Sequence, residues 1–228
     1  MTTVFGYIPN YVEAGVLVAD KQFTQSDQAG TPIGKQLQRK LWQNQDGTFA
    51  FGISGTMHSE NDELVRKIIS GDINIQRVTE KGNFPELRKI NIAKMGREVP
   101  NTDDISGLIG ITRFDDKPRL FNFFPLGSVQ ERVYTTIGSG SPRVEEYLTA
   151  LGTMNQAQDY MTSRTGILTD AIQIGLEAVR RSQAQDLYSH GLDMMVVTPE
   201  RINDHSEDLD DNFGRTLRSI NRKYKPAK

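Results

Sequence analysis

The order of the predicted elements indicates an α+β protein in which two β-sheets pack together and are covered by helices. Blocks of strand-forming residues alternate along the chain with blocks of helix-forming residues. The chain has 228 residues, which is long enough to bury a core. Its hydrophobic content of 36%, with 20 glycines besides, lies well above that of a disordered chain.

The chain opens with a predicted hairpin. Residues 4–8 and residues 15–19 are rich in β-branched, aromatic and small apolar side chains, which favour strands. Pro9 and Asn10 between them favour a turn. A polar loop is expected to follow over residues 24–34.

A second hairpin and the first helices come next. Residues 40–42 and 49–53 are the predicted strands, with a turn at residues 45–47. Ser59 can cap a helix because its hydroxyl accepts a hydrogen bond from a first-turn N–H, and Pro85 can begin another helix. The apolar stripe of the first helix is Leu64, Val65, Ile68 and Ile69.

The second half of the chain alternates in the same way. Its predicted strands are residues 105–112, 119–124, 133–137 and 192–197, and its predicted helices begin at Pro142 and span residues 167–182. Residues 1–200 are therefore expected to form one domain.

Residues 201–228 are expected to form an amphipathic helix and a basic tail. Acidic residues precede this helix and six basic residues lie in residues 215–228, an order that suits the helix dipole. The apolar residues recur every three or four positions, at Leu209, Phe213, Leu217, Ile220 and Tyr224. A helix that closes the same domain or contacts a neighbouring subunit is favoured, and nucleic-acid binding by the tail is the minority alternative.

Composition excludes several function classes. The 27 basic and 29 acidic residues leave a net charge of −2, which gives no general attraction for nucleic acid or membranes. The absence of cysteine excludes disulfides, thiolate catalysis and cysteine-bound zinc. No apolar run is long enough for a membrane span, and the first residues do not resemble a signal peptide. A cytoplasmic protein without a metal or cofactor is expected.

Three familiar chemical patterns receive little support. His58, His190 and His205 share no metal-ligand spacing. The acidic run at residues 207–211 is better explained as a solvated helix start than as a cation site. Residues 138–141, Gly-Ser-Gly-Ser, lack the lysine and glycine spacing of a phosphate-binding loop and favour a tight strand-to-helix turn.

Thr2 is the most informative residue at the N-terminus. Threonine is small enough at this position for Met1 to be removed, which would leave an α-amine and a hydroxyl on one residue. An α-amine has a pKa of about 7.7–8.0, so a useful fraction is unprotonated near neutral pH. It can then act as the general base for its own hydroxyl. Taken alone, this start is shared by many proteins that make no use of it.

Six segments in order resemble the proteasome β-subunits, a family of N-terminal nucleophile hydrolases. The segments are residues 2–6 (TTVFG), 18–20 with Thr24 (VAD), 39–42 (RKLW), 51–55 (FGISG), 137–142 (IGSGSP) and 186–193 (DLYSHGLD). The start is more similar to the bacterial proteasome-like threonine peptidases than to the archaeal subunits. His190 departs from the family pattern, which has glycine there, and residues 70–104 have no clear counterpart. The resemblance implies a four-layer αββα sandwich, which agrees with the element order.

The resemblance also implies catalytic roles. Thr2 would be the nucleophile with its own amine as base, and the charge on Lys40 would lower the pKa of that amine. Asp20 would pair with Lys40, and the Gly52 N–H would bind the oxyanion. The residues that would orient the α-amine are Ser139, Asp186 and Ser189. For each of these an ordinary structural role is the alternative, and for Ser139 the alternative is nearly as strong.

Substrate would bind as an added strand near Thr24 and Gly52. The side chains at the family's specificity-pocket positions are Phe23, Gln38, Ala50 and Ser54, none of which is charged.

The function implied is a threonine peptidase that cleaves unfolded polypeptides inside a self-assembled homo-oligomeric ring, with an ATP-dependent unfoldase as a possible partner. Two alternatives stay open. One is an amidase or transpeptidase, because the acyl-enzyme is the same and only the acceptor differs. The other is a catalytically silent ring subunit.

Overall fold

A computed structural model describes residues 3–9, 13–26, 32–55, 59–96, 105–114, 117–151, 168–183, 191–206 and 209. Within them lie two five-stranded antiparallel sheets and a separate two-stranded hairpin. No helix in these ranges is long and apolar enough to cross a membrane.

The first sheet has the strand order β10-β1-β2-β11-β12. Its strands are β1 (Val4–Tyr7), β2 (Gly15–Asp20), β10 (Tyr134–Ile137), β11 (Leu192–Val197) and β12 (Ile202–Asp204). The predicted first hairpin is confirmed, with Val4 opposite Ala19. On its other side Val4 lies opposite Ile137, so β1 is a central strand.

The second sheet has the strand order β5-β6-β7-β8-β9. Its strands are β5 (Leu41–Gln43), β6 (Phe49–Ile53), β7 (Leu108–Thr112), β8 (Arg119–Phe123) and β9 (Val129–Arg132). The predicted second hairpin is confirmed. Its turn is held by Asn44, whose Oδ1 accepts hydrogen bonds from the Thr48 and Phe49 N–H groups at 3.0 and 2.8 Å.

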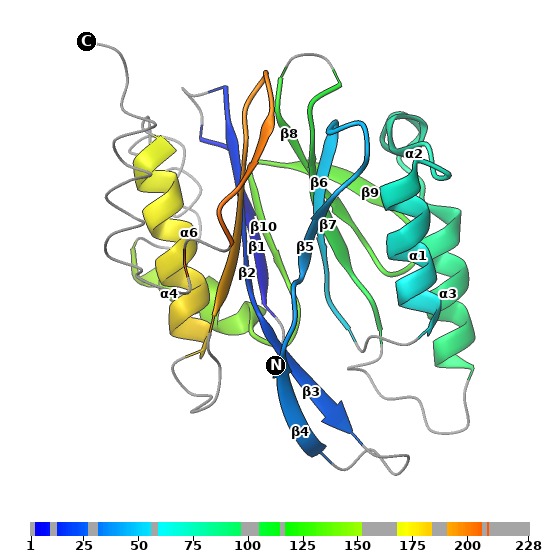
Figure 1. Cartoon of the computed structure of the whole chain (residues 1–228), viewed down its shortest axis with the longest axis horizontal. Helices are drawn as coiled ribbons and strands as arrows, with labels where there is room; N and C mark the ends of the chain where they lie inside the picture. The colour runs from blue at the N-terminus through cyan, green and yellow to red at the C-terminus, as the bar shows by residue number, and fades with distance from the viewer. Residues whose placement is uncertain are drawn as a thin grey trace.

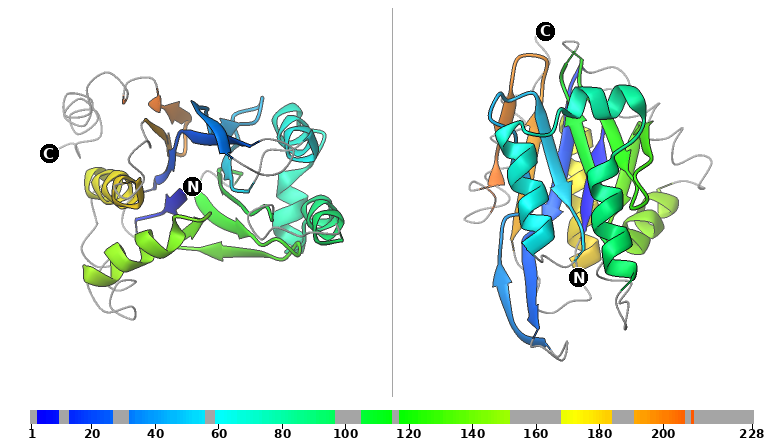
Figure 2. Two further views of the ribbon diagram at one scale, coloured as in Figure 1. Left: turned by 90° about the horizontal axis from the view of Figure 1, so that it is seen from below. Right: turned by 90° about the vertical axis from the view of Figure 1, so that its right-hand side faces the viewer.

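Helices lie on the outer side of each sheet (Figures 1 and 2). The helices α4 (Ser141–Ala150) and α6 (Leu168–Gln183) cover the first sheet. The helices α1 (Ser59–Ser70), α2 (Ile75–Lys81) and α3 (Pro85–Met95) cover the second. One face of α6 is buried against the first sheet and includes Leu168, Ile172, Gly175, Leu176 and Val179.

Three hydrophobic clusters follow from this arrangement. One joins the first sheet to α4 and α6, and another joins the second sheet to α1, α2 and α3. The third lies between the two sheets and includes Val4, Leu17, Leu41 and Ala50, all fully buried. Its position shows that the inner faces of the two sheets pack on each other.

The predicted loop at residues 24–34 is wrong in part. Residues 22–26 form β3 (Gln22–Ser26) and residues 32–37 form β4 (Pro32–Leu37), and the two strands pair with each other. Figure 1 shows this hairpin projecting beyond the two sheets. A strand pair outside the core needs no alternating apolar pattern, because its backbone hydrogen bonds can form without a buried face. The polar sequence of this segment therefore indicated a loop where the structure has a pair of strands.

Short elements account for the other differences from the predicted boundaries. Helix α2 was not expected, although the Asn74 side chain caps it by accepting the Arg77 N–H at 2.8 Å. The strands β9 and β12 were also missed, because short and polar edge strands carry a weak periodic signal.

The expected C-terminal helix lies almost wholly outside the described residues. Only its first apolar residue, Leu209, is described, and it packs in the cluster of α4 and α6. Before it, β12 pairs with β11, so residues 202–204 belong to the first sheet.

Candidate functional site

Asp20 lies at the point where the ends of several strands meet. It is the last residue of β2 and is 2% exposed. One carboxylate oxygen, Oδ1, accepts the Thr3 N–H at 2.6 Å, and the Asp20 N–H donates to the Thr3 carbonyl at 3.1 Å. The other oxygen, Oδ2, accepts a hydrogen bond from Lys40 Nζ at 2.8 Å. One side chain therefore joins the start of β1 to the start of β5.

Lys40 is a buried cation next to this carboxylate. Its side chain is 7% exposed and that of Asp20 is 3% exposed, so the pair is almost removed from solvent. Burial lowers the pKa of Lys40, and the negative charge and hydrogen bond of Asp20 oppose that shift. The geometry thus provides a charged lysine with a partner in a site of low polarity.

Asp193 is a second carboxylate at Lys40. It lies in β11, fully buried, and its Oδ2 accepts the Lys40 main-chain N–H at 2.5 Å. Its Oδ1 has no hydrogen-bond partner among the described residues, and Lys21 Nζ lies 3.8 Å from it. Burial raises the pKa of Asp193, whereas the hydrogen bond from the Lys40 N–H and the positive charge of Lys21 act to lower it. Asp20 therefore holds the tip of Lys40 and Asp193 holds its backbone.

The hydroxyl of Thr3 faces away from Lys40. Its Oγ1 lies 3.0 Å from the Oγ of Ser182, near the end of α6. Because the Ser182 hydroxyl donates its one hydrogen to the Val179 carbonyl at 2.7 Å, Thr3 is the donor in the first bond. The next side chain along β1, Val4, packs in the cluster between the sheets. Thr3 and Val4 thus show the two-residue alternation of a strand.

The predicted turn at residues 138–141 lies beside Thr3. It connects β10 to α4, as expected for a strand-to-helix turn, and Gly138 adopts a positive φ of 99°. A Cβ atom on Gly140 would lie 1.8 Å from Thr3 Oγ1, so only glycine fits there. Ser139, an exposed residue of this turn, is consequently placed near the N-terminal end of β1.

Gly52 lies in β6, opposite Leu41 of β5 and Ile109 of β7. A Cβ atom there would lie 2.6 Å from Val4 Cγ1 and 2.9 Å from Leu41 Cδ2, so the approach of the two sheets requires glycine. The oxyanion role of its N–H stays a prediction.

The orientation of the Gly52 peptide group follows from neighbouring bonds. The Ser54 N–H donates to the Gly107 carbonyl at 2.9 Å, and the Thr48 carbonyl accepts the Arg113 N–H at 2.9 Å. Both bonds join β6 and its ends to the neighbouring strand β7. Because the main-chain N–H and C=O groups of every second residue point to the same side of a strand, the Gly52 N–H also points toward β7. The amide on the β5 side, opposite Lys40, is that of Ile53.

The predicted pocket residues fall in different environments. Ala50 is fully buried in the cluster between the sheets, and Ser54 is 5% exposed. Gln38 is exposed, and its N–H donates to the Lys21 carbonyl at 2.7 Å, at the base of the projecting hairpin. Phe23 and Thr24 occupy β3, opposite Gln36 and Lys35. The predicted site residues Thr2, Asp186 and Ser189 lie outside the described residues.

Two residues of this region, Asp193 and Ser182, were not predicted from the sequence. Asp193 stands within the apolar run of residues 192–197, where a single acidic residue in a buried strand is an available signal. Ser182 near the end of a helix gives no comparable signal, because its contact with Thr3 joins residues 179 positions apart.

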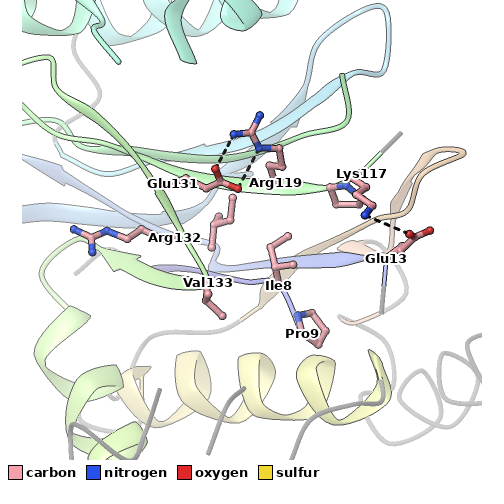
Figure 3. A pocket seen from close by; sticks show the side chains of 10 residues that line it. Ile8, Pro9, Glu13, Lys117, Arg119, Glu131, Arg132 and Val133 are labelled. Atoms are coloured by element: carbon pink, nitrogen blue, oxygen red, sulfur yellow. Dashed lines mark hydrogen bonds and ion pairs between the residues drawn. The ribbon is translucent and has the colours of Figure 1, made fainter. Parts of the chain in front are cut away.

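A pocket of about 420 Å³ lies at the opposite end of β1 from Thr3 (Figure 3). Ile8, Leu120 and Val133 line it together with the ion pair between Arg119 and Glu131, whose atoms approach to 2.7 Å. The described residues that line it include none of the predicted site residues.

Comparison with known proteins supports the resemblance seen in the sequence. No family model matches the chain. The proteasome subunit beta of Methanopyrus kandleri is 34% identical over 87 residues, which is 38% of this chain and 37% of that protein. The proteasome subunit beta 2 of Hyperthermus butylicus is 30% identical over 99 residues, 43% of this chain and 42% of that protein.

The similarity to proteasome β-subunits is therefore confirmed. The matched part spans about two fifths of the length of each of these curated relatives.

Proposed function

We propose that this protein is a proteasome-like threonine peptidase with the four-layer αββα sandwich of the N-terminal nucleophile hydrolases. The observation that carries the proposal is the position of Asp20, which bonds both to Lys40 Nζ and to the Thr3 N–H. A buried lysine is thereby fixed next to the residue that follows Thr2. Similarity to two proteasome β-subunits supports the same class.

The alternation of β1 supports Thr2 as the nucleophile rather than Thr3. The Thr3 hydroxyl is directed to Ser182, whereas Val4 faces the space between the sheets. If the alternation continues by two residues, the Thr2 side chain lies on the face of Val4. Gly52 approaches Val4 on that face, with the Lys40 carbonyl nearby.

The proposed reaction begins after Met1 has been removed. The α-amine of Thr2 accepts the proton of its own hydroxyl while Oγ1 attacks the carbonyl carbon of the scissile peptide. The amine then gives the proton to the leaving nitrogen, and the C–N bond breaks to leave an ester on Thr2. Water, deprotonated by the same amine, hydrolyses that ester and releases the second product.

The charge on Lys40 serves the amine in this scheme. A cation near an α-amine disfavours its protonated form, which lowers the pKa of the amine below about 7.7–8.0. Asp20 keeps Lys40 charged despite its burial, since the carboxylate opposes the desolvation shift. Ser139, Asp186 and Ser189 would orient the amine.

Substrate would add as a strand beside Thr24 and the end of β6. The main-chain amide of Ile53 is proposed to bind the oxyanion in place of the Gly52 amide expected from the resemblance, because the Ile53 N–H faces the β5 side and the Gly52 N–H faces β7. The specificity positions remain Phe23, Gln38, Ala50 and Ser54.

We further propose assembly into a homo-oligomeric ring that acts on unfolded polypeptides, with an unfoldase as partner. Residues 201–228 would close the same domain or contact a neighbouring subunit.

Two variants test the nucleophile. Thr2→Ala should abolish hydrolysis of a fluorogenic peptide, because the attacking hydroxyl is lost. Thr3→Ala is the matched control. It should keep most of the activity and lower the free energy of unfolding by about 1 kcal/mol, since one buried hydrogen bond is removed. An active Thr2→Ala together with an inactive Thr3→Ala would show that the register is wrong by one residue.

A further inference from the structure

Four polar side chains are buried beneath the helices that cover the second sheet. Asn61 of α1, Asn91 and Lys94 of α3, and Ser106 before β7 are each at most 2% exposed. Burying an ammonium group costs free energy even when it is hydrogen-bonded, and an apolar side chain at position 94 would avoid this cost. A role in positioning would explain why polar groups occupy this place.

The four side chains form one connected network. Lys94 Nζ donates to Ser106 Oγ at 2.8 Å and to Asn61 Oδ1 at 3.1 Å. The Ser106 hydroxyl donates to the same Asn61 oxygen at 2.9 Å. Asn91 accepts the Ser106 N–H at 2.8 Å and donates to the Ser106 carbonyl at 2.9 Å, so it binds both main-chain polar groups of that residue. Every polar group of Ser106 is thus fixed by α1 and α3.

Residues 105–107 rest directly on the end of β6. The Ser54 N–H donates to the Gly107 carbonyl at 2.9 Å, and the Gly107 N–H donates to Ser54 Oγ at 3.3 Å. A Cβ atom on Gly55 would lie 2.8 Å from the Ile105 carbonyl and 3.0 Å from Ser106 Oγ. Gly55 has a φ of 99°, so the chain turns there against Ser106. The helices therefore hold Ser106, and residues 105–107 hold Ser54 and Gly55.

We propose that Asn61, Asn91, Lys94 and Ser106 are positioning residues for the substrate-binding end of β6. This inference rests on the proposed function, in which substrate adds as a strand beside residues 52–54. The network fixes the register of that strand from the side of α1 and α3. A small displacement there weakens the binding of an extended substrate and shifts the main-chain amide proposed to bind the oxyanion, without changing the nucleophile or its base.

The test compares Lys94→Met with Leu87→Ala. Methionine has a similar length and removes the ammonium group. Leu87 lies on the same helix and is fully buried in the hydrophobic cluster, and its apolar side chain can form no hydrogen bond to the network, so its truncation serves as a control for stability. Hydrogen exchange is followed by mass spectrometry in peptides covering residues 53–55 and, as an internal reference, β8.

Lys94→Met should raise exchange at residues 53–55 by about tenfold relative to β8 and lower kcat/KM for a long unfolded peptide at least about tenfold. Leu87→Ala should leave that exchange ratio and kcat/KM unchanged. Equal exchange ratios in the two variants, or a changed ratio with an unchanged kcat/KM, would overturn the proposal.

Ser106→Ala replaces Lys94→Met if the latter does not fold, with the same expected and contradicting results. A wild-type protein that hydrolyses no peptide would overturn the proposed function, whereas the exchange ratio still decides whether the network holds the end of β6.

Discussion

Asp20 and Lys40 illustrate how one contact can serve both the fold and the chemistry. The carboxylate satisfies the Thr3 N–H and the Lys40 ammonium group at once, at 2.6 and 2.8 Å. Removing one member of a buried ion pair leaves the other charge without compensation, which typically costs about 3–5 kcal/mol. Loss of Lys40 should therefore reduce stability as well as rate.

Lys40→Ala should lower kcat/KM by about tenfold near pH 7, because at its ordinary pKa of about 7.7–8.0 only about a tenth of the Thr2 α-amine is unprotonated there. Its residual activity should rise toward higher pH, where the amine loses its proton unaided. Lys40→Arg keeps the charge and should fail chiefly through misplacement. A pH–rate profile of the three proteins checks this, and a wild-type profile in folded Lys40→Ala would contradict the role of the lysine.

The buried carboxyl group of Asp193 should make the stability of the protein depend on pH. Burial raises its pKa above 3.8, so the folded chain keeps this proton at pH values where the unfolded chain has lost it. The contribution of Asp193 to stability therefore falls as pH rises from about 4 through its folded pKa. Asp193→Asn cannot titrate, so its stability relative to wild type should increase over that window. Denaturant unfolding at pH 4, 5, 6 and 7 measures the difference; a constant or decreasing difference would contradict it.

At the scale of elements, the predictable strands were those with a buried apolar run. The strands β1, β2 and β6 are buried along their whole length, and the hairpins β1–β2 and β5–β6 were both expected. By contrast β3, β4 and β9 have polar sequences and gain their structure from pairing with a neighbour. Such pairing depends on contacts remote in sequence, which the local pattern does not reveal.

The same difference between signals in the local sequence and contacts remote in sequence holds for the site. Lys40 and Asp20 were expected together because the resemblance supplied both. Asp193 and Ser182 were not expected, since each contacts a residue that is remote in the sequence: Lys40 and Thr3 respectively. Their roles follow from the position of β11 within the first sheet and from the packing of α6 on that sheet.

The turn between β10 and α4 should be intolerant of a side chain at Gly140. In Gly140→Ala, the new Cβ would lie 1.8 Å from Thr3 Oγ1, so the Thr3 side chain must move and its bond to Ser182 is lost. We expect a loss of about 1–3 kcal/mol in the free energy of unfolding. Gly96→Ala is the matched control, because a Cβ there meets nothing closer than 3.6 Å.

Adding Thr3→Ala to Gly140→Ala should recover part of that stability, because the clashing oxygen is removed. Chemical denaturation of the two single variants and the double variant measures the coupling. If the losses in the free energy of unfolding are strictly additive, the side chain added at position 140 does not clash with Thr3.

At the scale of the whole molecule, the proposed site lies where the two sheets meet. Asp20 and Asp193 come from the first sheet, whereas Lys40 leads into the second. The cluster between the sheets, with Val4 and Leu41 in it, fixes the distance between these groups. The proposed catalytic groups Asp20 and Lys40 are thus placed by the packing of the two sheets and not by one loop.

The proposed mechanism requires Thr2, with a free amine, as the nucleophile. Intact-mass spectrometry of the active protein, before and after reaction with a peptide acylating reagent, tests this role. We expect a chain that lacks Met1 and gains one acyl group, which fragmentation locates on Thr2. A fully active protein that retains Met1, or an acyl group on any other residue, would contradict it.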